Sequence, residues 1–181
     1  NVIVPCDAIE ARKATVAAAK VWGPVYLRFG REKMPVFTTE ATPFKIGKAE
    51  IFWKSKKPEV SLIGCGTMVH YALLAAKELE EEGIGTMVIN NHTIKPLDEK
   101  TLLAALEECG AAVTVEEHQV LGGLGGAIAE LAAKNNPVPL EFVGMQNVFG
   151  ESGPPKDLIE KYGMGTKDIK AAVRKVLKRK K

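Results

Sequence analysis

The feature that most constrains the fold is a regular alternation of short apolar segments and longer helical segments from Glu59 onward. The pattern predicts strands over residues 60–63, 85–89, 112–115 and 140–143. It predicts helices over residues 67–82, 99–109, 124–134, 155–162 and 166–178. Such alternation is typical of a three-layer α/β/α domain with a mostly parallel sheet.

A separate strand–helix–strand pattern precedes this alternation. Residues 2–4 and 25–29 are typical of strands, and an Ala-rich helix lies between them, with Asp7 and Glu10 at the spacing of a capping box. A lone βαβ unit cannot bury both faces of its strands. We therefore expect it either to dock on the rest of the chain or to be the last piece of another domain, loosely held or paired with another chain.

Domain boundaries follow from these two patterns. We expect a βαβ remnant over residues 1–36, a linker of loop composition over 37–43, and the α/β/α domain over 44–181. Residues 44–53 are expected to form an extended strand that adds one antiparallel edge to the otherwise parallel sheet.

Composition excludes several classes of protein. With 46% hydrophobic and 26% charged residues, the chain is not collagen-like, disordered or a disulfide scaffold. No apolar run approaches the roughly 18–20 residues of a membrane helix. Three cysteines without CxxC spacing predict buried, reduced thiols in a cytoplasmic protein. The basic C-terminal residues lack nearby aromatic side chains, so we expect no nucleic-acid binding and assign them to a helix C-terminus.

Ligands of open α/β sheets bind at the carboxyl ends of the strands, where four loops can be named. The first, Gly64-Cys65-Gly66-Thr67, lacks the third glycine of a dinucleotide turn and predicts a tight turn with Thr67 near the helix cap. In the second, residues 90–98, Asp98 is placed to cap the next helix and His92 could act as an acid or base.

The third loop, residues 115–126, contains Glu116, Glu117, His118 and four glycines. The two adjacent glutamates should point to opposite faces while the strand persists. The favoured interpretation is that the glycines shape the loop and allow close contact with another subunit. A role for Glu117 or His118 at the edge of a ligand is the second interpretation. A metal site is the least favoured. The fourth loop, residues 149–155, has turn chemistry and a helix start.

A cluster of cations follows the second strand of the βαβ unit. Arg28, Arg31 and Lys33 lie within six residues at the carboxyl end of that strand. Guanidinium groups bind phosphate in a bidentate manner, so this segment is either an anion site or an ordinary solvated basic loop.

Several of these runs, taken in order, resemble a known family. Residues 23–35 (GPVYLRFGREKMP), 93–98 (TIKPLD), 115–118 (VEEH), 122–125 (GGLG) and 149–153 (FGESG) are similar to the C-terminal half of transketolase. The similarity is greatest to short, split transketolases, in which the C-terminal section is a separate chain. It covers essentially the whole chain.

The resemblance implies a function and an arrangement of modules. The complete enzyme would use thiamine diphosphate and Mg²⁺ to move a two-carbon ketol unit between sugar phosphates, in the pentose phosphate pathway. Residues 1–36 would end its pyrimidine-binding domain, and residues 44–181 would be its C-terminal domain with homodimer contacts. The family's phosphate-binding arginine corresponds to Arg31, with Arg28 as second choice.

The resemblance also implies what the chain lacks. The carboxylate that activates the cofactor and the Gly-Asp-Gly metal segment lie elsewhere in the family, so we expect no catalytic, cofactor-binding or metal-binding residue here. A partner, the N-terminal transketolase section, would supply them, and the isolated chain would be inactive and bind no cofactor.

Two alternatives remain at this point. One is the matching part of a 1-deoxyxylulose-5-phosphate synthase or of a 2-oxo-acid dehydrogenase β chain, although residues 30–33 and Glu117-His118 favour transketolase. The other is a stand-alone α/β module that binds an anion or nucleotide at residues 64–67.

Overall fold

The computed structural model describes residues 1–180. Its largest feature is a five-stranded sheet with the order β3-β5-β4-β7-β8, in which β3 is antiparallel to β5 and all other pairs are parallel. The strands are β3 (Glu50–Lys54), β4 (Val60–Gly64), β5 (Thr86–Asn90), β7 (Ala112–Gln119) and β8 (Leu140–Met145). The predicted α/β class with one antiparallel edge strand is confirmed.

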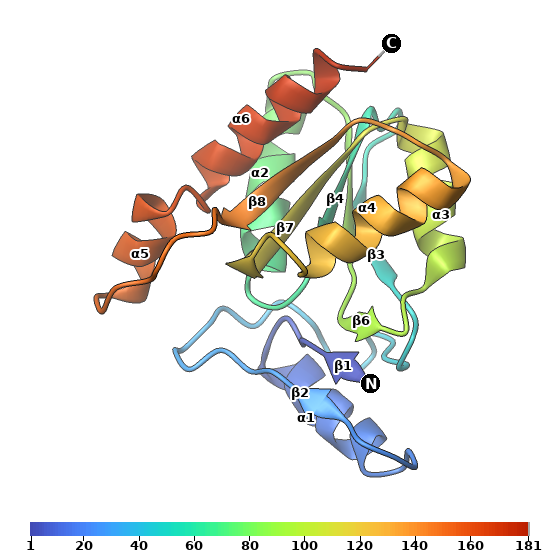
Figure 1. The fold of residues 1–181 in the computed structure, drawn as a ribbon, viewed down its shortest axis with the longest axis vertical. Helices are drawn as coiled ribbons and strands as arrows, with labels where there is room; N and C mark the ends of the chain where they lie inside the picture. The colour runs from blue at the N-terminus through green and yellow to red at the C-terminus, as the bar shows by residue number, and fades with distance from the viewer. Residues whose placement is uncertain (181) are drawn as a thin grey trace.

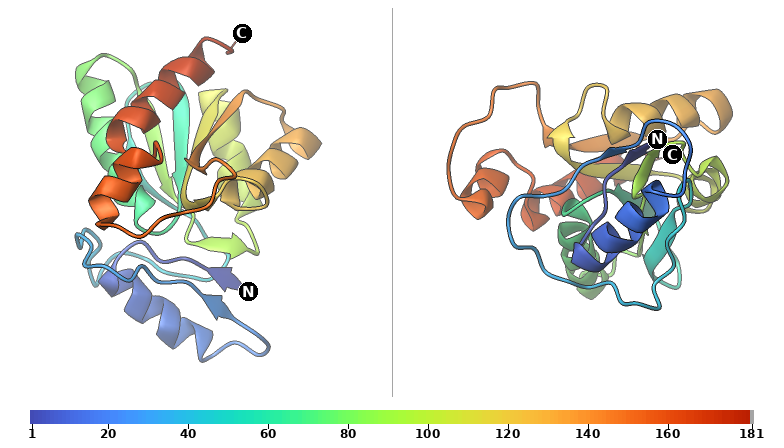
Figure 2. Two further views of the ribbon diagram at one scale, coloured as in Figure 1. Left: turned by 60° about the vertical axis from the view of Figure 1, so that its left-hand side comes forward. Right: turned by 90° about the horizontal axis from the view of Figure 1, so that it is seen from below.

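Helices cover both faces of this sheet (Figures 1 and 2). They are α2 (Met68–Glu81), α3 (Glu99–Cys109), α4 (Leu124–Asn135), α5 (Pro155–Lys161) and α6 (Thr166–Leu177). Alternate residues of β4 face opposite layers, so Leu62 packs in the cluster with α2 and α6, and Ile63 packs in the cluster with α3 and α4. Burying each such side chain contributes roughly 1.5–3 kcal/mol, so two separate cores hold the sheet.

The βαβ unit consists of β1 (Val2–Ile3), α1 (Ala8–Ala18) and β2 (Tyr26–Leu27). It docks on the rest of the chain, because β1 pairs in parallel with β2 on one side and antiparallel with β6 (Thr93–Lys95) on the other. The Val4 N–H also donates to the His92 carbonyl at 2.8 Å. Of the two outcomes expected for the unit, docking within the chain is therefore observed for β1.

Buried carboxylates lie where the unit meets the sheet. Asp7 caps α1 as predicted, accepting from the Glu10 N–H at 3.0 Å, and it also accepts from the Thr38 N–H at 2.6 Å. Glu10 accepts from the Cys6 N–H and from Asn90 Nδ2, both at 2.7 Å. Burial raises the pKa of Glu10. The start of the predicted linker is therefore anchored by Asp7.

The strand predicted over residues 44–53 is wrong in its first half. The observed strand β3 begins at Glu50, because Gly47 adopts a positive φ of 78° and its N–H donates to Thr93 Oγ1 at 3.1 Å. The Phe44 ring instead stacks on His92, with ring centroids 4.3 Å apart.

Two expectations from composition can be compared with the structure. Cys6, Cys65 and Cys109 are free and buried, as predicted. The basic residues of α6 pair with carboxylates of the domain, Lys170 with Glu78 at 2.6 Å and Arg174 with Glu82 at 2.5 Å. Within residues 1–180, no helix has both the length and the apolar character needed to cross a membrane.

Candidate functional site

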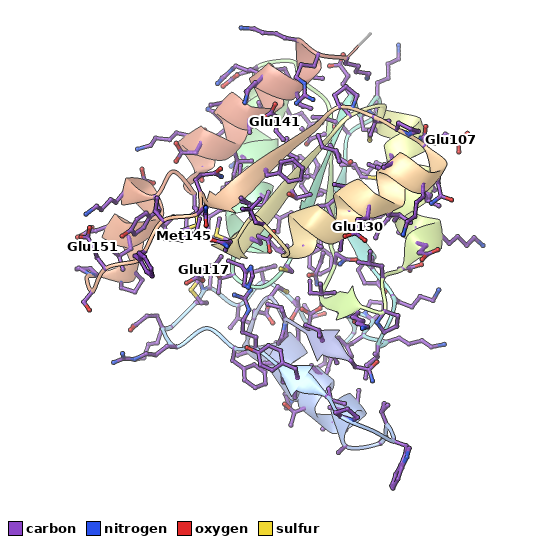
Figure 3. All side chains as sticks on the ribbon, viewed as in Figure 1. Glu107, Glu117, Glu130, Glu141, Met145 and Glu151 are labelled. Atoms are coloured by element: carbon purple, nitrogen blue, oxygen red, sulfur yellow. The ribbon has the colours of Figure 1, made fainter. Side chains whose placement is uncertain are left out.

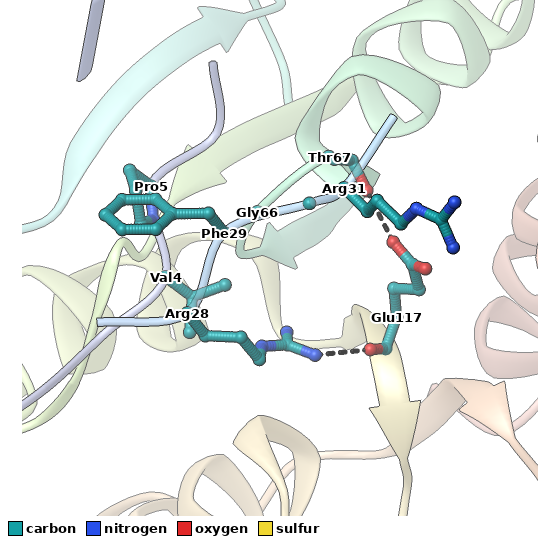
Figure 4. Close-up of a pocket in the computed structure, with 9 residues that line it drawn as sticks. Val4, Pro5, Arg28, Phe29, Arg31, Gly66, Thr67 and Glu117 are labelled. Carbon is teal, nitrogen blue, oxygen red and sulfur yellow. Dashed lines mark hydrogen bonds between the residues drawn. The ribbon is translucent and has the colours of Figure 1, made fainter. Parts of the chain in front are cut away.

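A hollow of about 120 Å³ lies between the βαβ unit and the carboxyl end of the five-stranded sheet (Figure 4). Figure 3 labels Glu117, near the end of β7, on the side that faces the unit. Four segments of the chain line the hollow: the residues after β1, the residues after β2, the turn before α2, and the end of β7. Its lining residues are Val4, Pro5, Arg28, Phe29, Gly30, Arg31, Gly66, Thr67 and Glu117. The topology therefore brings both predicted arginines together with Glu117.

Arg28 is half-buried and already has a protein partner. Its Nη1 donates to the backbone carbonyl of Glu117 at 2.5 Å, which ties the βαβ unit to β7. Nearby, burial raises the pKa of the Cys65 thiol to about 12, so this cysteine is protonated and non-nucleophilic at neutral pH.

Arg31 differs from Arg28 in having no partner. Its side chain is exposed, and within residues 1–180 its guanidinium makes no hydrogen bond or salt bridge. Figure 4 shows it at the same mouth of the hollow as the carboxylate of Glu117. The guanidinium is therefore available to an anion that enters from solvent.

Thr67 forms the opposite wall. It occupies the N-cap position of α2, as the predicted tight turn requires, but its hydroxyl makes no cap bond and instead donates to Glu117 Oε2 at 3.0 Å. Gly66 in this turn has a positive φ of 60°, a conformation that favours glycine. The turn is confirmed, and its role in lining the hollow was missed because the loop motif indicates nothing about the segments facing it.

Glu116 and Glu117 point in opposite directions, as predicted. Glu116 is buried and accepts from the N–H groups of Leu124 and Gly125, both at 2.8 Å, so it caps α4. A side chain at Gly123 would collide with this carboxylate. Loop shaping is therefore the observed role of Glu116.

His118 lies outside the hollow. Its Nδ1 is 2.7 Å from the Gln119 carbonyl and 3.7 Å from Glu116 Oε2, and its side chain is about half exposed. In the part of the chain that the structure describes, no three His, Cys, Asp or Glu side chains gather in a way that could hold a metal ion.

His92, the acid or base candidate, also lies away from the hollow. It is fully buried, and burial lowers its pKa to about 4. Its imidazole is therefore neutral at pH 7, stacked on Phe44, with Nδ1 2.9 Å from Thr93 Oγ1. The sequence position at a strand end did not reveal this burial.

The two arginines of the hollow are groups that can bind an anion. Their guanidinium groups and the Glu117 carboxylate lie at the hollow, and guanidinium groups bind phosphate or carboxylate oxygens. Complete small-molecule pockets usually measure about 300–1,000 Å³, so the hollow has room for only part of a substrate. No lining residue is a histidine or cysteine that could act as a nucleophile.

Comparison with known sequences points to one family. The family model "Transketolase, C-terminal domain" matches residues 47–169. A 6-deoxy-6-sulfo-D-fructose transketolase subunit from Clostridium sp. (strain MSTE9) is 41% identical over 99% of this chain and 55% of its own length. A putative transketolase C-terminal section from Methanocaldococcus jannaschii is 33% identical over 98% of this chain and 56% of its own length.

Solved structures agree with this. A split gene transketolase, described as an inactive beta4 tetramer, superposes with a TM-score of 0.94 and 42% identity over 99% of this chain and 58% of that one. Transketolase from Campylobacter jejuni shares the fold, with a TM-score of 0.73 at 23% identity over 96% of this chain and 26% of its own. The chain spans little more than half the length of the clostridial subunit and of the Methanocaldococcus section. Because the family model covers most of its residues, this chain belongs to the transketolase C-terminal domain family.

Proposed function

We propose that this chain is the C-terminal section of a two-part transketolase, an enzyme that transfers a two-carbon ketol group between sugar phosphates. The observation that carries the proposal is the superposition of nearly the whole chain on a split gene transketolase at 42% identity. Relatives described as a subunit and as a C-terminal section match it over nearly its whole length as well. Enzymes of this class are transferases of aldehyde or ketone groups.

The proposal gives the hollow a role in substrate binding. Arg31, exposed and unpaired within the described chain, would bind the phosphate of the sugar, and Arg28 is second choice because the Glu117 carbonyl already occupies it. A hollow of about 120 Å³ is completed when another surface closes over it. That surface would come from the N-terminal section of the enzyme.

The same proposal divides the chain. Residues 1–36 would complete a pyrimidine-binding domain, and residues 44–181 would form the C-terminal domain. Residues 37–43 would be the linker between these two domains. Homodimer contacts, a cytoplasmic location and a place in the pentose phosphate pathway belong to this proposal too.

Thiamine diphosphate with Mg²⁺ is the cofactor that the family implies, and the residues of this chain do not fit it. The described residues lack a cluster of acidic or histidine side chains that could hold the metal. The charged lining of the hollow is two arginines and one glutamate that faces them. We therefore propose that the N-terminal section holds the cofactor.

The alternatives are less well supported. The named relatives quoted above are transketolases, which does not favour a deoxyxylulose-phosphate synthase or a 2-oxo-acid dehydrogenase β chain. A stand-alone nucleotide module at residues 64–67 is not favoured because the Thr67 hydroxyl is engaged by Glu117.

Reconstitution tests the proposal. Mixed with its N-terminal section, thiamine diphosphate and Mg²⁺, the chain should convert xylulose 5-phosphate and an aldose phosphate acceptor but not pyruvate. The sulfosugar of the clostridial relative is a further donor to compare. Sedoheptulose phosphate produced by the chain alone would contradict the proposal.

Arg31→Ala tests the phosphate site in the reconstituted enzyme. Loss of a charge-assisted pair costs roughly 1.5–3 kcal/mol, so KM for the sugar phosphate should rise about 10- to 100-fold while kcat changes little. Lys33→Ala, which removes a neighbouring cation outside the hollow, is the matched control and should leave KM unchanged. An unchanged KM in Arg31→Ala would remove Arg31 from the site.

A further inference from the structure

The charge balance of the hollow is unusual for an anion site. Only three of its lining residues are charged, and they are Arg28, Arg31 and Glu117. Two positive groups and one negative group leave a single net positive charge. A carboxylate at the mouth of a site for a sugar phosphate repels the ligand that the arginines attract.

The Glu117 carboxylate is held in this place by a specific contact. Its Oε2 accepts from the hydroxyl of Thr67, which is 8% exposed, at 3.0 Å. Its backbone carbonyl separately accepts from Arg28, so the support of Arg28 does not depend on the side chain of Glu117. Figure 4 shows the carboxylate between the Thr67 hydroxyl and the Arg31 guanidinium.

The Glu117 carboxylate makes fewer contacts with the fold than the carboxylate beside it. The neighbouring Glu116 caps α4 through two backbone N–H groups, whereas the side chain of Glu117 is exposed and bonds to a single hydroxyl. Within the described chain, the Glu117 carboxylate forms no salt bridge with either arginine of the hollow. Its charge is the property left to explain.

We propose that Glu117 is a specificity-determining residue, whose negative charge lowers the preference of the hollow for doubly charged over singly charged headgroups. This inference rests on the proposed function of the hollow as the headgroup site. Repulsion by one fixed charge grows in proportion to the charge of the ligand. A phosphate monoester carries about −1.5 to −2 at pH 7, so it is penalised about twice as much, in free energy, as a sulfonate or another monoanion.

Glu117→Gln isolates the charge, because glutamine keeps an oxygen that accepts from Thr67 and leaves the backbone carbonyl in place. In the reconstituted enzyme, KM for a phosphorylated donor should fall about 5- to 10-fold, a size set by a partly screened charge at the mouth of the hollow. KM for an otherwise matched donor with a monoanionic headgroup should fall only about 2- to 3-fold. KM for an unphosphorylated donor should change less than KM for either charged donor.

A binding measurement on the chain itself separates this inference from the proposed function. Backbone amide shifts of Gly30 and Thr67 are followed by NMR during titration with inorganic phosphate and with methanesulfonate. Glu117→Gln should tighten phosphate binding more than methanesulfonate binding, and Glu107→Gln on the exposed face of α3 should change neither. Equal tightening for both anions, or weaker phosphate binding, would overturn the role of Glu117.

The Arg31→Ala variant is included in the same titration. If phosphate binds this variant as well as the parent chain, the proposed phosphate site fails whatever Glu117 does. If Arg31→Ala loses phosphate but Glu117→Gln behaves like the parent chain toward both anions, the phosphate site stands and the charge-tuning role is wrong.

Discussion

The five-stranded sheet and the βαβ unit are built from similar strand and helix patterns but are packed very differently. Every residue of β4 and β5 is buried, and helices cover both faces. In the unit, the strands are two residues long, and Trp22, Tyr26 and Phe29 are exposed, with Trp22 fully so. Similar strand patterns can therefore lie in differently packed regions. The sheet has helices on both faces, whereas α1 is the one helix of the unit.

The unit is nevertheless attached by specific contacts rather than by a large core. β6 supplies a main-chain partner for β1, and Asp7 and Glu10 receive hydrogen bonds from the Thr38 and Cys6 backbone and from Asn90. Short sheets need such partners, because an isolated hairpin-sized sheet is marginally stable in water. Polar contacts thus add to the burial of a few apolar side chains, Ile3, Val4 and Cys6, at this joint, where the unit meets the sheet.

The largest expected effect is on the sheet. Leu62→Ala removes a fully buried side chain from β4, and we expect it to lower the free energy of unfolding by about 2–5 kcal/mol. The matched change Val16→Ala on α1, where the side chain is 51% exposed, should stay within about 0.5 kcal/mol. Urea unfolding measures both free energies. Similar losses of stability in the two variants would show that the sheet and the unit do not differ in packing as described.

The next largest expected effect is on the pH dependence of stability, and it comes from His92, beside the contact between β1 and β6. Its pKa of about 4 in the folded chain lies below the usual value near 6.5, because burial disfavours the charged imidazole. Between these values only the unfolded chain takes up the proton, so the free energy of unfolding should fall as pH drops from 6.5 to 4, by up to about 3 kcal/mol.

The measurement is urea unfolding at several pH values, with the imidazole titration followed by NMR. His92→Gln should flatten the dependence in this window. His118→Gln is the control, since that side chain is about half exposed. A His92 signal that titrates near 6.5 in the folded chain would contradict the explanation.

Hydrogen exchange compares the two regions directly. Amides of β4 and β5 should exchange at least about 100-fold more slowly than those of β2, an edge strand whose one partner in the described three-stranded sheet is β1. β1 should be intermediate, because β6 protects its other edge. Equal protection in β2 and β4 would show that the unit is held as firmly as the sheet.

Most of the larger domain was predictable because strong periodic signals coincide with burial. The four predicted parallel strands, the helices that follow them and the caps at Asp7 and Asp98 are all found. β6 was not predicted, because three residues inside a loop carry no periodic signal and depend on β1 for pairing. The failure at residues 44–49 has a similar cause, since contacts of Gly47 and Phe44 with residues 92–93 bend the chain there.

The charged residues of the hollow could be named from the sequence, but their assembly with Thr67 could not. Arg28, Arg31 and Glu117 could be named from their positions at strand ends, and Glu117 could be separated from Glu116 by strand alternation. The contact of Thr67 with Glu117 spans 50 residues of sequence and that of Arg28 with the Glu117 carbonyl spans 89. Contacts of this range follow from the docking of the unit, which no local pattern encodes.

The hollow has one wall on each side of the joint, with Arg31 on the βαβ unit and Thr67 at the start of α2. An anion held by both walls would be a non-covalent cross-link between the two regions. By mass action, it would stabilise the seating of the unit more than it stabilises the sheet. Substrate concentration would then also govern how firmly the least packed part of this chain is held.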